Sequence, residues 1–456
     1  MKYKLLFLYF SLYYCYLFIP LQYKPIYRYN NDSHPEIYNS IINTKLYAKI
    51  YIGIPKQNIE IPLDFNSNDF YISDINFKYF DSNGKLYTDI KFYDSSKSTS
   101  LSSLEDIYYD GNNFFLGEYS KDIFYFNETK IDLEFYLPIK LKNEDSGAIG
   151  LLLNTISFNS ERSFLKTIKN KYLIENYYWS ILYFDDNIFL FIGKLPHELN
   201  YKLTKFMNND FDYNFDNMTI INAKVENGIV KNIININKIK IHQNEKEYCL
   251  DDIKTIELNY HSGGIEFPII LLHFYENIFA EYIYKKKCFK EELHEPKNIY
   301  FFYCYNDNLL INEIKHIFPV VQFCSNINFD FYLEFNDLFY TKGNFIYFLI
   351  FFDDSNNKNI SKITMGKPFM KKYKFSFNPE KKQIFLYSNN KKKNENDDSN
   401  LNELNNNENT FKIIIASICA FIFICLFIYL FTKIYLLKKI NRKKKANELE
   451  DEFEYE

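Results

Sequence analysis

Two short segments of this chain carry the side chains best suited to acid–base chemistry. In the first segment, Asp64 ends an apolar run and Ser67 follows three residues later. In the second, IELNYHSGG places Glu257, Asn259 and His261 close together. A carboxylate can exchange a proton with water during a reaction when it is suitably positioned. No metal-ligand constellation, phosphate-binding loop or Ser/His/Asp arrangement appears in the sequence, which therefore implies no cofactor and no metal.

The residues around Asp64 resemble the N-terminal active-site segment of pepsin-like aspartic proteases (peptidase family A1). In that family a strand and an Ile-Gly-x-Pro-x-Gln turn lead to two hydrophobic residues and Asp-Thr-Gly-Ser-Ser. Residues 46–74 here read LYAKIYIGIPKQNIEIPLDFNSNDFYISD. Gly53, Pro55 and Gln57 fill the turn, and Asp64 falls on the first catalytic aspartate.

Further segments resemble elements of the family in the family's order. They are FYDSSKSTS (92–100), YYDGNNFFLGEYSKD (108–122), SGAIGLLL (146–153), YWSILYFDDNIFLFIGKLP (178–196), FPVVQF (318–323) and ITMGKPFMKKYKFSFNPEKKQIFLY (363–387). The resemblance makes 108–122 the flap hairpin, with Tyr109 as the flap tyrosine that contacts substrate. It implies a mainly β, bilobal fold with lobes at 44–195 and 196–388.

The chemistry of the family depends on two aspartates that share one proton and hold a water between them. The ionised member takes the proton of the water, and the neutral member polarises the scissile carbonyl, so the pair titrates as one unit. By resemblance, the hydroxyl of Ser67 hydrogen-bonds Asp64. Phe65 replaces the threonine that braces the pair. Asn66 replaces a glycine, although Asn tolerates left-handed backbone better than most residues.

The second loop departs further from the family pattern. Aligned on Pro268, it places Asn259 at the second aspartate position, with Tyr260 and His261 where a hydroxyl residue and a glycine are expected. An amide does not ionise or accept a proton at neutral pH, so it cannot share the proton of the pair. Asp64 is then expected to have no like charge nearby. Loss of one member of a joint catalytic unit removes orders of magnitude of rate, so the sequence predicts impaired or absent hydrolysis.

Three replacements for the missing carboxylate are open. His261 could act as a base, although a lone histidine in a strand–turn is more often structural. Glu257 could share the face of the strand on which Asn259 lies, but about 6.6 Å away. Asn259 could deamidate, although the tyrosine that follows makes this slow.

The composition indicates a folded chain of two or three domains. The 456 residues are 47% hydrophobic and 25% charged, which excludes wholesale disorder. A net charge of −4 argues against nucleic acid as a partner, since most of its binders carry a basic face. The high share of Tyr and Phe is interpreted as compositional bias. Alternation in runs such as NIEIPLDF and KKQIFLYS predicts strands, and the best helix candidates are 161–171 and 269–284.

Both ends of the chain carry hydrophobic segments. Residues 1–20 have the layout of a signal peptide or uncleaved signal anchor, and 21–43 form an N-terminal segment. A polar stalk at 389–410 precedes a predicted transmembrane helix at 411–437. Lysines that follow it place the tail, 438–456, in the cytoplasm. The prediction is a single-pass type I membrane protein of the secretory pathway or cell surface, or a two-pass protein if the first segment is uncleaved.

Four cysteines lie in the predicted lumenal part: Cys249, Cys288, Cys304 and Cys324. Their even number suits two disulfides in an oxidising compartment, with three pairings open.

Three functions remain open from the sequence. The first is a membrane-anchored homologue that is catalytically impaired or inactive and keeps a cleft for a polypeptide ligand, or has a scaffold role. The second is a working aspartic-type endopeptidase with a non-standard dyad. The third is a structural surface protein in which Phe65 and Tyr260 close the cleft. Asn259 favours the first over the second.

Overall fold

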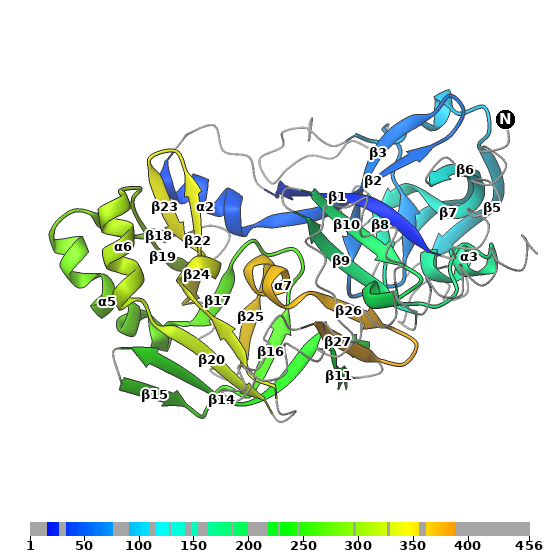
Figure 1. Cartoon of the computed structure of the whole chain (residues 1–456). Coiled ribbons are helices and arrows are strands. Elements are labelled where there is room, and N and C mark those ends of the chain that lie inside the picture. Colours follow the sequence, from blue (N-terminus) through cyan, green and yellow to red (C-terminus); the bar gives the residue numbers. More distant parts are fainter. Residues whose placement is uncertain are drawn as a thin grey trace, which may run out of the picture. The chain divides into compact units, whose positions relative to one another are not determined.

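The computed structural model (Figure 1) describes 14 ranges of the chain. They are residues 16–26, 33–75, 91–109, 115–126, 129–141, 147–153, 163–184, 187–198, 218–226, 229–243, 246–294, 298–325, 329–354 and 362–387. All of them belong to one compact unit, Met1–Asn389. The predicted membrane segment 411–437 and tail 438–456 lie outside the described residues. Within the described ranges, no helix is long and apolar enough to cross a membrane.

The described residues are mainly β, as predicted, and most strands belong to two large sheets. The first sheet has the order β11 (Met218–Asn222), β27 (Gln383–Tyr387), β26 (Phe375–Asn378), β9 (Trp179–Phe184), β10 (Asn187–Ile192), β1 (Leu17–Pro25), β2 (Thr44–Ile52), β3 (Gln57–Asp64), β8 (Gly147–Gly150), β4 (Phe70–Ile72), β7 (Thr129–Leu141), β6 (Phe115–Phe126) and β5 (Ser102–Tyr109). The runs NIEIPLDF and KKQIFLYS form β3 and β27, which confirms the strands that their alternation predicts.

The second sheet comes from the C-terminal half of the chain. Its order is β21 (Phe331–Leu333), β20 (Val320–Ser325), β14 (Ile233–Gln243), β16 (Thr255–Leu258), β25 (Lys362–Met365), β17 (Ile265–Pro268), β24 (Ile350–Asp353), β19 (Ile299–Tyr305), β23 (Phe345–Phe348) and β22 (Phe339–Lys342). Two more strands extend it, β15 (Lys246–Leu250) beside β14 and β18 (Cys288–Leu293) beside β19. A separate hairpin pairs β12 (Lys224–Glu226) with β13 (Ile229–Lys231).

In the described ranges the helices are few and short. They are α2 (His34–Ile42), α3 (Phe164–Asn170), α5 (Leu272–Tyr284), α6 (Asn308–Ile317) and α7 (Lys367–Tyr373). The helix candidates at 161–171 and 269–284 are confirmed as α3 and as a 3-10 turn followed by α5.

Each candidate loop follows a strand that pairs in parallel with a later strand. Asp64 ends β3, which pairs with β8, and Asn259 follows β16, which pairs with β25. A glycine stands at the end of each partner strand: Gly150 is the last residue of β8, and Gly366 directly follows β25. A Cβ at Gly150 would lie 2.5 Å from the backbone of Asn68, and one at Gly366 would lie 2.4 Å from the carbonyl oxygen of Ser262. Both loops therefore need a residue without a side chain beside them.

The first described strand overlaps the predicted leader. β1 lies between β10 and β2, and Leu17 pairs with Ile192. Ile19 is buried in the core. Residues 17–20 are thus part of a central strand, and cleavage after residue 20 would remove its first four residues.

Aromatic side chains fill much of the core. The largest fully buried side chains include Trp179, Tyr38, Tyr275 and Tyr347. Aromatic residues bury large areas and pack edge-to-face or tilted, which Tyr275 does against Phe267 and other phenylalanines. Many of the aromatic residues that the structure describes therefore have a packing role.

The four described cysteines form one disulfide, so the expectation of two among them is wrong for this structure. Cys288 and Cys304 are linked across β18 and β19, whereas Cys249 and Cys324 are free thiols. The two free thiols lie on opposite sides of β14, because β15 and β20 flank that strand. Two strand spacings amount to roughly 9.5 Å, beyond the Cα–Cα separation of about 4.4–6.8 Å that a disulfide spans.

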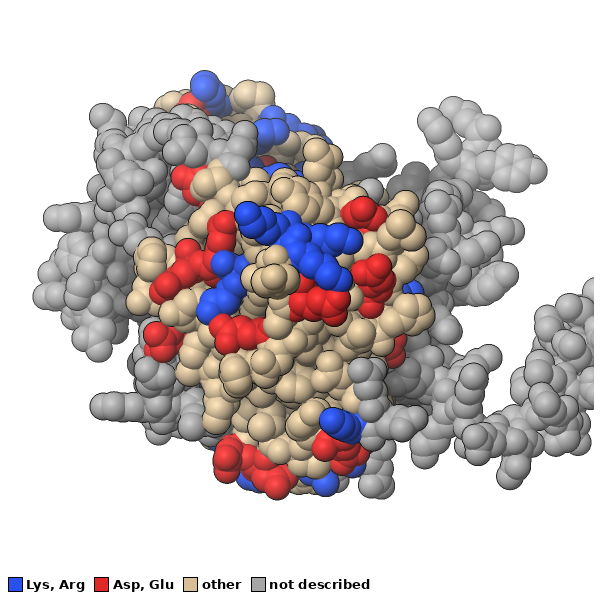
Figure 2. Space-filling model, turned by 90° about the vertical axis from the view of Figure 1, so that its left-hand side faces the viewer, with Lys and Arg blue, Asp and Glu red and all other residues tan. Residues whose placement is uncertain are grey.

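Figure 2 shows the side of the protein on which α5 and α6 lie, with positive and negative side chains interspersed. Local ion pairs account for part of this pattern, for example Lys290 with Glu276 at 2.6 Å. This face therefore presents no large patch of one sign.

Candidate functional site

The first loop holds the Asp64 carboxylate by hydrogen bonds from its own backbone. Oδ1 of Asp64 accepts the backbone N–H groups of Asn66 (2.8 Å) and Ser67 (3.2 Å), and Oδ2 accepts the Ser67 hydroxyl at 2.8 Å. The hydrogen bond that the resemblance implies for Ser67 is thus present. Because three donors surround this carboxylate, its orientation is fixed by the loop.

The loop is tied to the residues after β8 by backbone hydrogen bonds. Leu151 N–H donates to the carbonyl oxygen of Asp64 at 2.9 Å, and Leu152 N–H donates to that of Ser67 at 3.0 Å. Trp179 adds an indole N–H bond to the Leu151 carbonyl at 3.0 Å. These bonds position the loop within the fold.

A second carboxylate, which the sequence reasoning missed, belongs to the same loop. Asp69 donates its backbone N–H to the Ser67 hydroxyl at 3.3 Å. Burial and, secondarily, the charge of Asp64 raise the pKa of Asp69 to about 6. The expectation that Asp64 has no like charge nearby is therefore wrong. The only signal in the sequence is an acidic residue five positions after Asp64.

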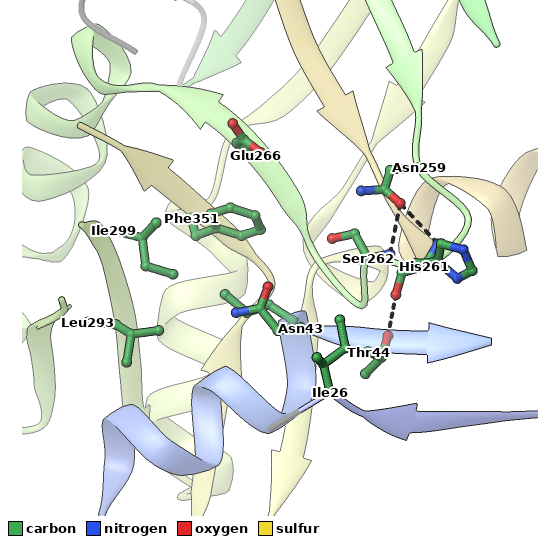
Figure 3. Close-up of a pocket in the computed structure, with 11 residues that line it drawn as sticks. Ile26, Asn43, Thr44, Asn259, His261, Ser262, Glu266, Leu293, Ile299 and Phe351 are labelled. Atoms are coloured by element: carbon green, nitrogen blue, oxygen red, sulfur yellow. Dashed lines mark hydrogen bonds between the residues drawn. The ribbon is translucent and has the colours of Figure 1, made fainter. Parts of the chain in front are cut away.

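The second loop repeats the turn of the first with an amide in place of the carboxylate. Oδ1 of Asn259 accepts the backbone N–H groups of His261 (3.0 Å) and Ser262 (3.3 Å), as Figure 3 shows. The hydroxyls differ between the loops. Ser262 donates to the carbonyl oxygen of Gly264 at 2.9 Å, whereas Ser67 donates to the aspartate.

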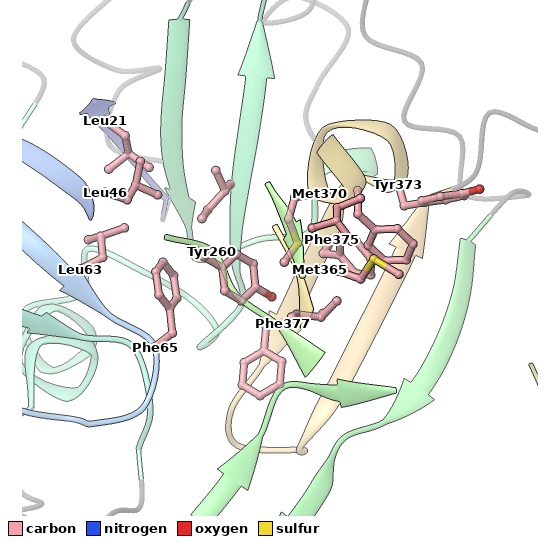
Figure 4. Packing of buried hydrophobic residues seen from close by; sticks show 14 of the residues in the cluster. Leu21, Leu46, Leu63, Phe65, Tyr260, Met365, Met370, Tyr373, Phe375 and Phe377 are labelled. Atoms are coloured by element: carbon pink, nitrogen blue, oxygen red, sulfur yellow. The ribbon is translucent and has the colours of Figure 1, made fainter. Parts of the chain in front are cut away.

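The two loops meet through an aromatic stack. The rings of Phe65 and Tyr260 lie 4.4 Å apart between centroids, and Trp179 contacts both, at 5.5 Å and 5.4 Å. Figure 4 shows the two residues facing each other. From the sequence, replacement of the bracing threonine by Phe65 means only the loss of a hydrogen bond. In the structure, the ring of Phe65 instead packs against that of Tyr260.

His261 is held by the segment that leads into β2. Its Nδ1 accepts the backbone N–H of Leu46 at 3.1 Å, and its carbonyl oxygen accepts the Thr44 hydroxyl. Glu257, the other candidate replacement, forms an ion pair with Lys362. Both side chains thus have structural partners in the described part of the chain.

The predicted flap is a β hairpin, and only its strands are described. β5 and β6 pair antiparallel, with Tyr109 opposite Phe115 at the end of β5. The tip, 110–114, and the side chain of Tyr109 lie outside what the structure describes. The substrate role of Tyr109 stays a prediction.

A cavity of about 230 Å³ adjoins Asn259. Its apolar wall includes Ile299, Leu293 and Phe351, and Glu266 contributes a carboxylate (Figure 3). The chain segment before β2 runs along the loop at this cavity. Asn43 and Ser262 form an isolated antiparallel bridge, and Gly263 N–H donates to the Ile42 carbonyl oxygen at 3.0 Å.

No cluster of three or more metal-ligating side chains is found among the described residues. Asp64 and Asp69 contribute carboxylates and Asn259 contributes an amide to the acid–base or binding chemistry of this site, and Glu266 adds a carboxylate at the cavity.

Comparison with known proteins agrees with this geometry. Residues 45–188 match the family model described as eukaryotic aspartyl protease. No curated protein matches the chain. The matched range contains Asp64, Ser67 and Tyr109, and the loop of Asn259 lies beyond it.

Proposed function

We propose that the chain, which carries a domain similar to eukaryotic aspartyl proteases, is an aspartic peptidase homologue that binds polypeptides without hydrolysing them. The side chain of Asn259 carries this proposal. Its Oδ1 accepts two backbone N–H groups. The remaining polar atom of the side chain is the amide nitrogen Nδ2, which is a hydrogen-bond donor. The corresponding atom of Asp64 is a carboxylate oxygen, Oδ2. A carboxylate and an amide can hydrogen-bond each other, but they cannot share and pass a proton.

Peptide binding is supported by features of the site that do not depend on an ionisable side chain: the loop backbone, the apolar cavity wall and a strand-like contact. Aspartic proteases bind polypeptide substrates, and both loops keep the same backbone turn around their first residue. The cavity beside Asn259 offers an apolar wall for a side chain of a bound peptide. The Asn43–Ser262 bridge is an example of strand-like docking on this loop, the mode by which extended peptides add to sheet edges.

The cellular setting in this proposal is the secretory pathway, with the chain anchored by the predicted membrane helix at 411–437. The Cys288–Cys304 disulfide supports an oxidising compartment.

A second candidate, residual aspartic-type hydrolysis, is favoured by one observation. Asp69 belongs to the Asp64 loop, and the pKa of Asp69 is raised to about 6. Pairs of carboxylates whose pKa values are pushed apart can divide the acid and base roles between them. In this alternative Asp69 supplies the proton that Asn259 cannot.

The test uses the full chain purified in detergent and a mixed peptide library between about pH 4 and 7. Wild type, Asp64→Ala, Asp69→Asn and Asn259→Asp are compared for peptide retention and for cleavage. We expect wild type to retain peptides without cleaving them, and Asn259→Asp to gain cleavage. The other departures, Tyr260 and His261, limit the expected gain to a small fraction of family rates.

Two results would contradict the proposal. Cleavage by wild type that Asp64→Ala and Asp69→Asn both abolish would establish the residual-hydrolysis alternative. Absence of both retention and cleavage in folded wild type would leave no peptide-binding role.

A further inference from the structure

A second and larger cavity, of about 780 Å³, adjoins the second loop at Gly263. Its walls come from β1, α2, the β9–β10 hairpin, the β22–β23 hairpin and α7, and it shares only Thr44 with the cavity at Asn259. Its volume falls in the range of about 300–1,000 Å³ that is typical of small-molecule sites. Nothing in the proposed peptide-binding function uses it.

The charged side chains that line this cavity are predominantly positive. The single acid among them is Asp337. The four basic residues are Lys342, Lys367, Lys371 and Lys372. Asp337 already accepts hydrogen bonds from Lys372 at 2.6 Å and from the backbone N–H of Glu334 at 2.9 Å. The cavity therefore keeps an excess of positive charge in a chain whose net charge is −4.

Two of the lysines have no anionic partner in the described part of the chain. Lys342, at the end of β22, and Lys371, in α7, are both exposed and form no ion pair there. Lys367 instead lies 5.0 Å from the ring centre of Tyr23. Lysine ammonium groups are strongly hydrated point charges that suit phosphate oxygens, so Lys342 and Lys371 are the groups available to an anion.

Part of the remaining wall is apolar and aromatic, and Ser40, Thr44 and Asn336 add polar side chains. Tyr23, Tyr183, Ile188 and Phe339 line the cavity. The hydroxyl of Tyr23 donates to the Tyr260 carbonyl oxygen at 3.0 Å and therefore accepts from Tyr183 at 2.9 Å. With both hydroxyls engaged, these residues offer mainly their ring surfaces. A ligand that fits must combine negative charge with an apolar or aromatic body.

We propose that this cavity binds an organic phosphate, with the phosphate groups held by Lys342 and Lys371 and the organic part lying against the aromatic wall. Such a ligand would lie against Gly263 and Thr44. Binding of a phosphate here does not depend on whether the chain binds or cleaves peptides.

The test measures binding of ATP and of inorganic pyrophosphate to the full chain in detergent, by equilibrium dialysis at about 50 mM and 300 mM salt. Lys342→Ala/Lys371→Ala is compared with Lys315→Ala, which alters an exposed lysine of α6 outside the cavity. A second variant, Lys342→Arg/Lys371→Arg, keeps the charge. Thermal unfolding checks that each variant is folded.

We expect saturable binding of ATP that is tighter than that of pyrophosphate and weaker at high salt. The double alanine variant should lose at least tenfold in affinity for ATP, while Lys315→Ala and the arginine variant stay within about twofold. Absence of saturable binding would overturn the proposal. Equal affinity of the double alanine variant and Lys315→Ala would overturn it as well, because the binding would then lie elsewhere.

Discussion

Phe65 and Tyr260 stack on each other at 4.4 Å between ring centroids and 26° between ring planes, so the residues that follow Asp64 and Asn259 form one packed contact. Both rings are nearly inaccessible, at 4% and 2% exposure. Ring packing therefore joins the two loops where the resembling family uses hydroxyl hydrogen bonds. In the sequence, Phe65 and Tyr260 each replace a hydroxyl residue of the family pattern. In the structure, their ring contact takes the place of the lost hydrogen bonds.

This pair should show energetic coupling. Phe65→Leu, Tyr260→Leu and the double variant keep an apolar residue while removing the ring contact. We expect a coupling energy of about 1 kcal/mol in urea unfolding. The control cycle combines Phe65→Leu with Phe302→Leu. Phe302 packs on Phe279 and Phe348 and not on Phe65, so the two effects should add. Additive effects in the Phe65–Tyr260 cycle would contradict the stacking contribution.

The phenol of Tyr260 gives a second prediction. Its hydroxyl is buried without a hydrogen-bond partner among the described residues, and burial raises the pKa of Tyr260 well above its usual range. An unsatisfied buried hydroxyl is costly, so Tyr260→Phe should leave the unfolding free energy unchanged or raise it by up to about 1 kcal/mol.

Tyr38→Phe is the matched control for that variant. The Tyr38 hydroxyl is equally buried but donates to the Phe348 carbonyl oxygen at 2.8 Å. Its removal should lower the unfolding free energy by about 1 kcal/mol. Equal losses from both variants would show that Tyr260 has a partner after all.

The strands around the site could be predicted because their signal is local. Alternation in NIEIPLDF defines β3 and places Asp64 at its end, and Ser67 is close enough in sequence for its bond to Asp64 to follow from the motif. The site residues that could not be predicted depend on three-dimensional context. The effect of Asp69 comes from burial. The Phe65–Tyr260 stack comes from loops far apart in the sequence.

Cysteine pairing also depends on three-dimensional context that the sequence does not reveal. An even count predicts disulfides but says nothing of strand order. β14 lies between Cys249 on β15 and Cys324 on β20, and this arrangement keeps the two thiols apart.

The disulfide itself should contribute measurably to stability. Cys288 and Cys304 are 16 residues apart, and closing a loop of this size stabilises the folded state by about 3 kcal/mol in the chain-entropy model. We expect Cys288→Ser/Cys304→Ser to lose roughly that amount in urea unfolding. Cys249→Ser, at an exposed thiol, should change stability by less than about 0.5 kcal/mol. Non-reducing peptide mapping that links Cys249 to Cys324 would contradict the assignment.

Asp69 predicts a specific dependence of stability on pH. Burial and the Asp64 charge raise the pKa of Asp69 from 3.8 to about 6, so the folded state binds the proton more tightly than the unfolded state. The stabilisation from this proton is fully present below about pH 4 and is lost as the pH rises through about 6. Asp69→Asn has no proton to lose. Its unfolding free energy relative to wild type should therefore increase between pH 4 and 7, by about 2 kcal/mol.

Asp94→Asn serves as a control of opposite sign. Hydrogen bonds from Lys97 and Ser96 lower the pKa of Asp94, so its ionised form stabilises the fold at higher pH. That variant should lose stability relative to wild type at pH 7 and little at pH 3, in the same urea series. If Asp69→Asn and wild type differ by a constant amount from pH 4 to 7, Asp69 does not hold a proton in the folded state. In that case it could not serve as the acid beside Asp64, and the residual-hydrolysis alternative would lose its only support.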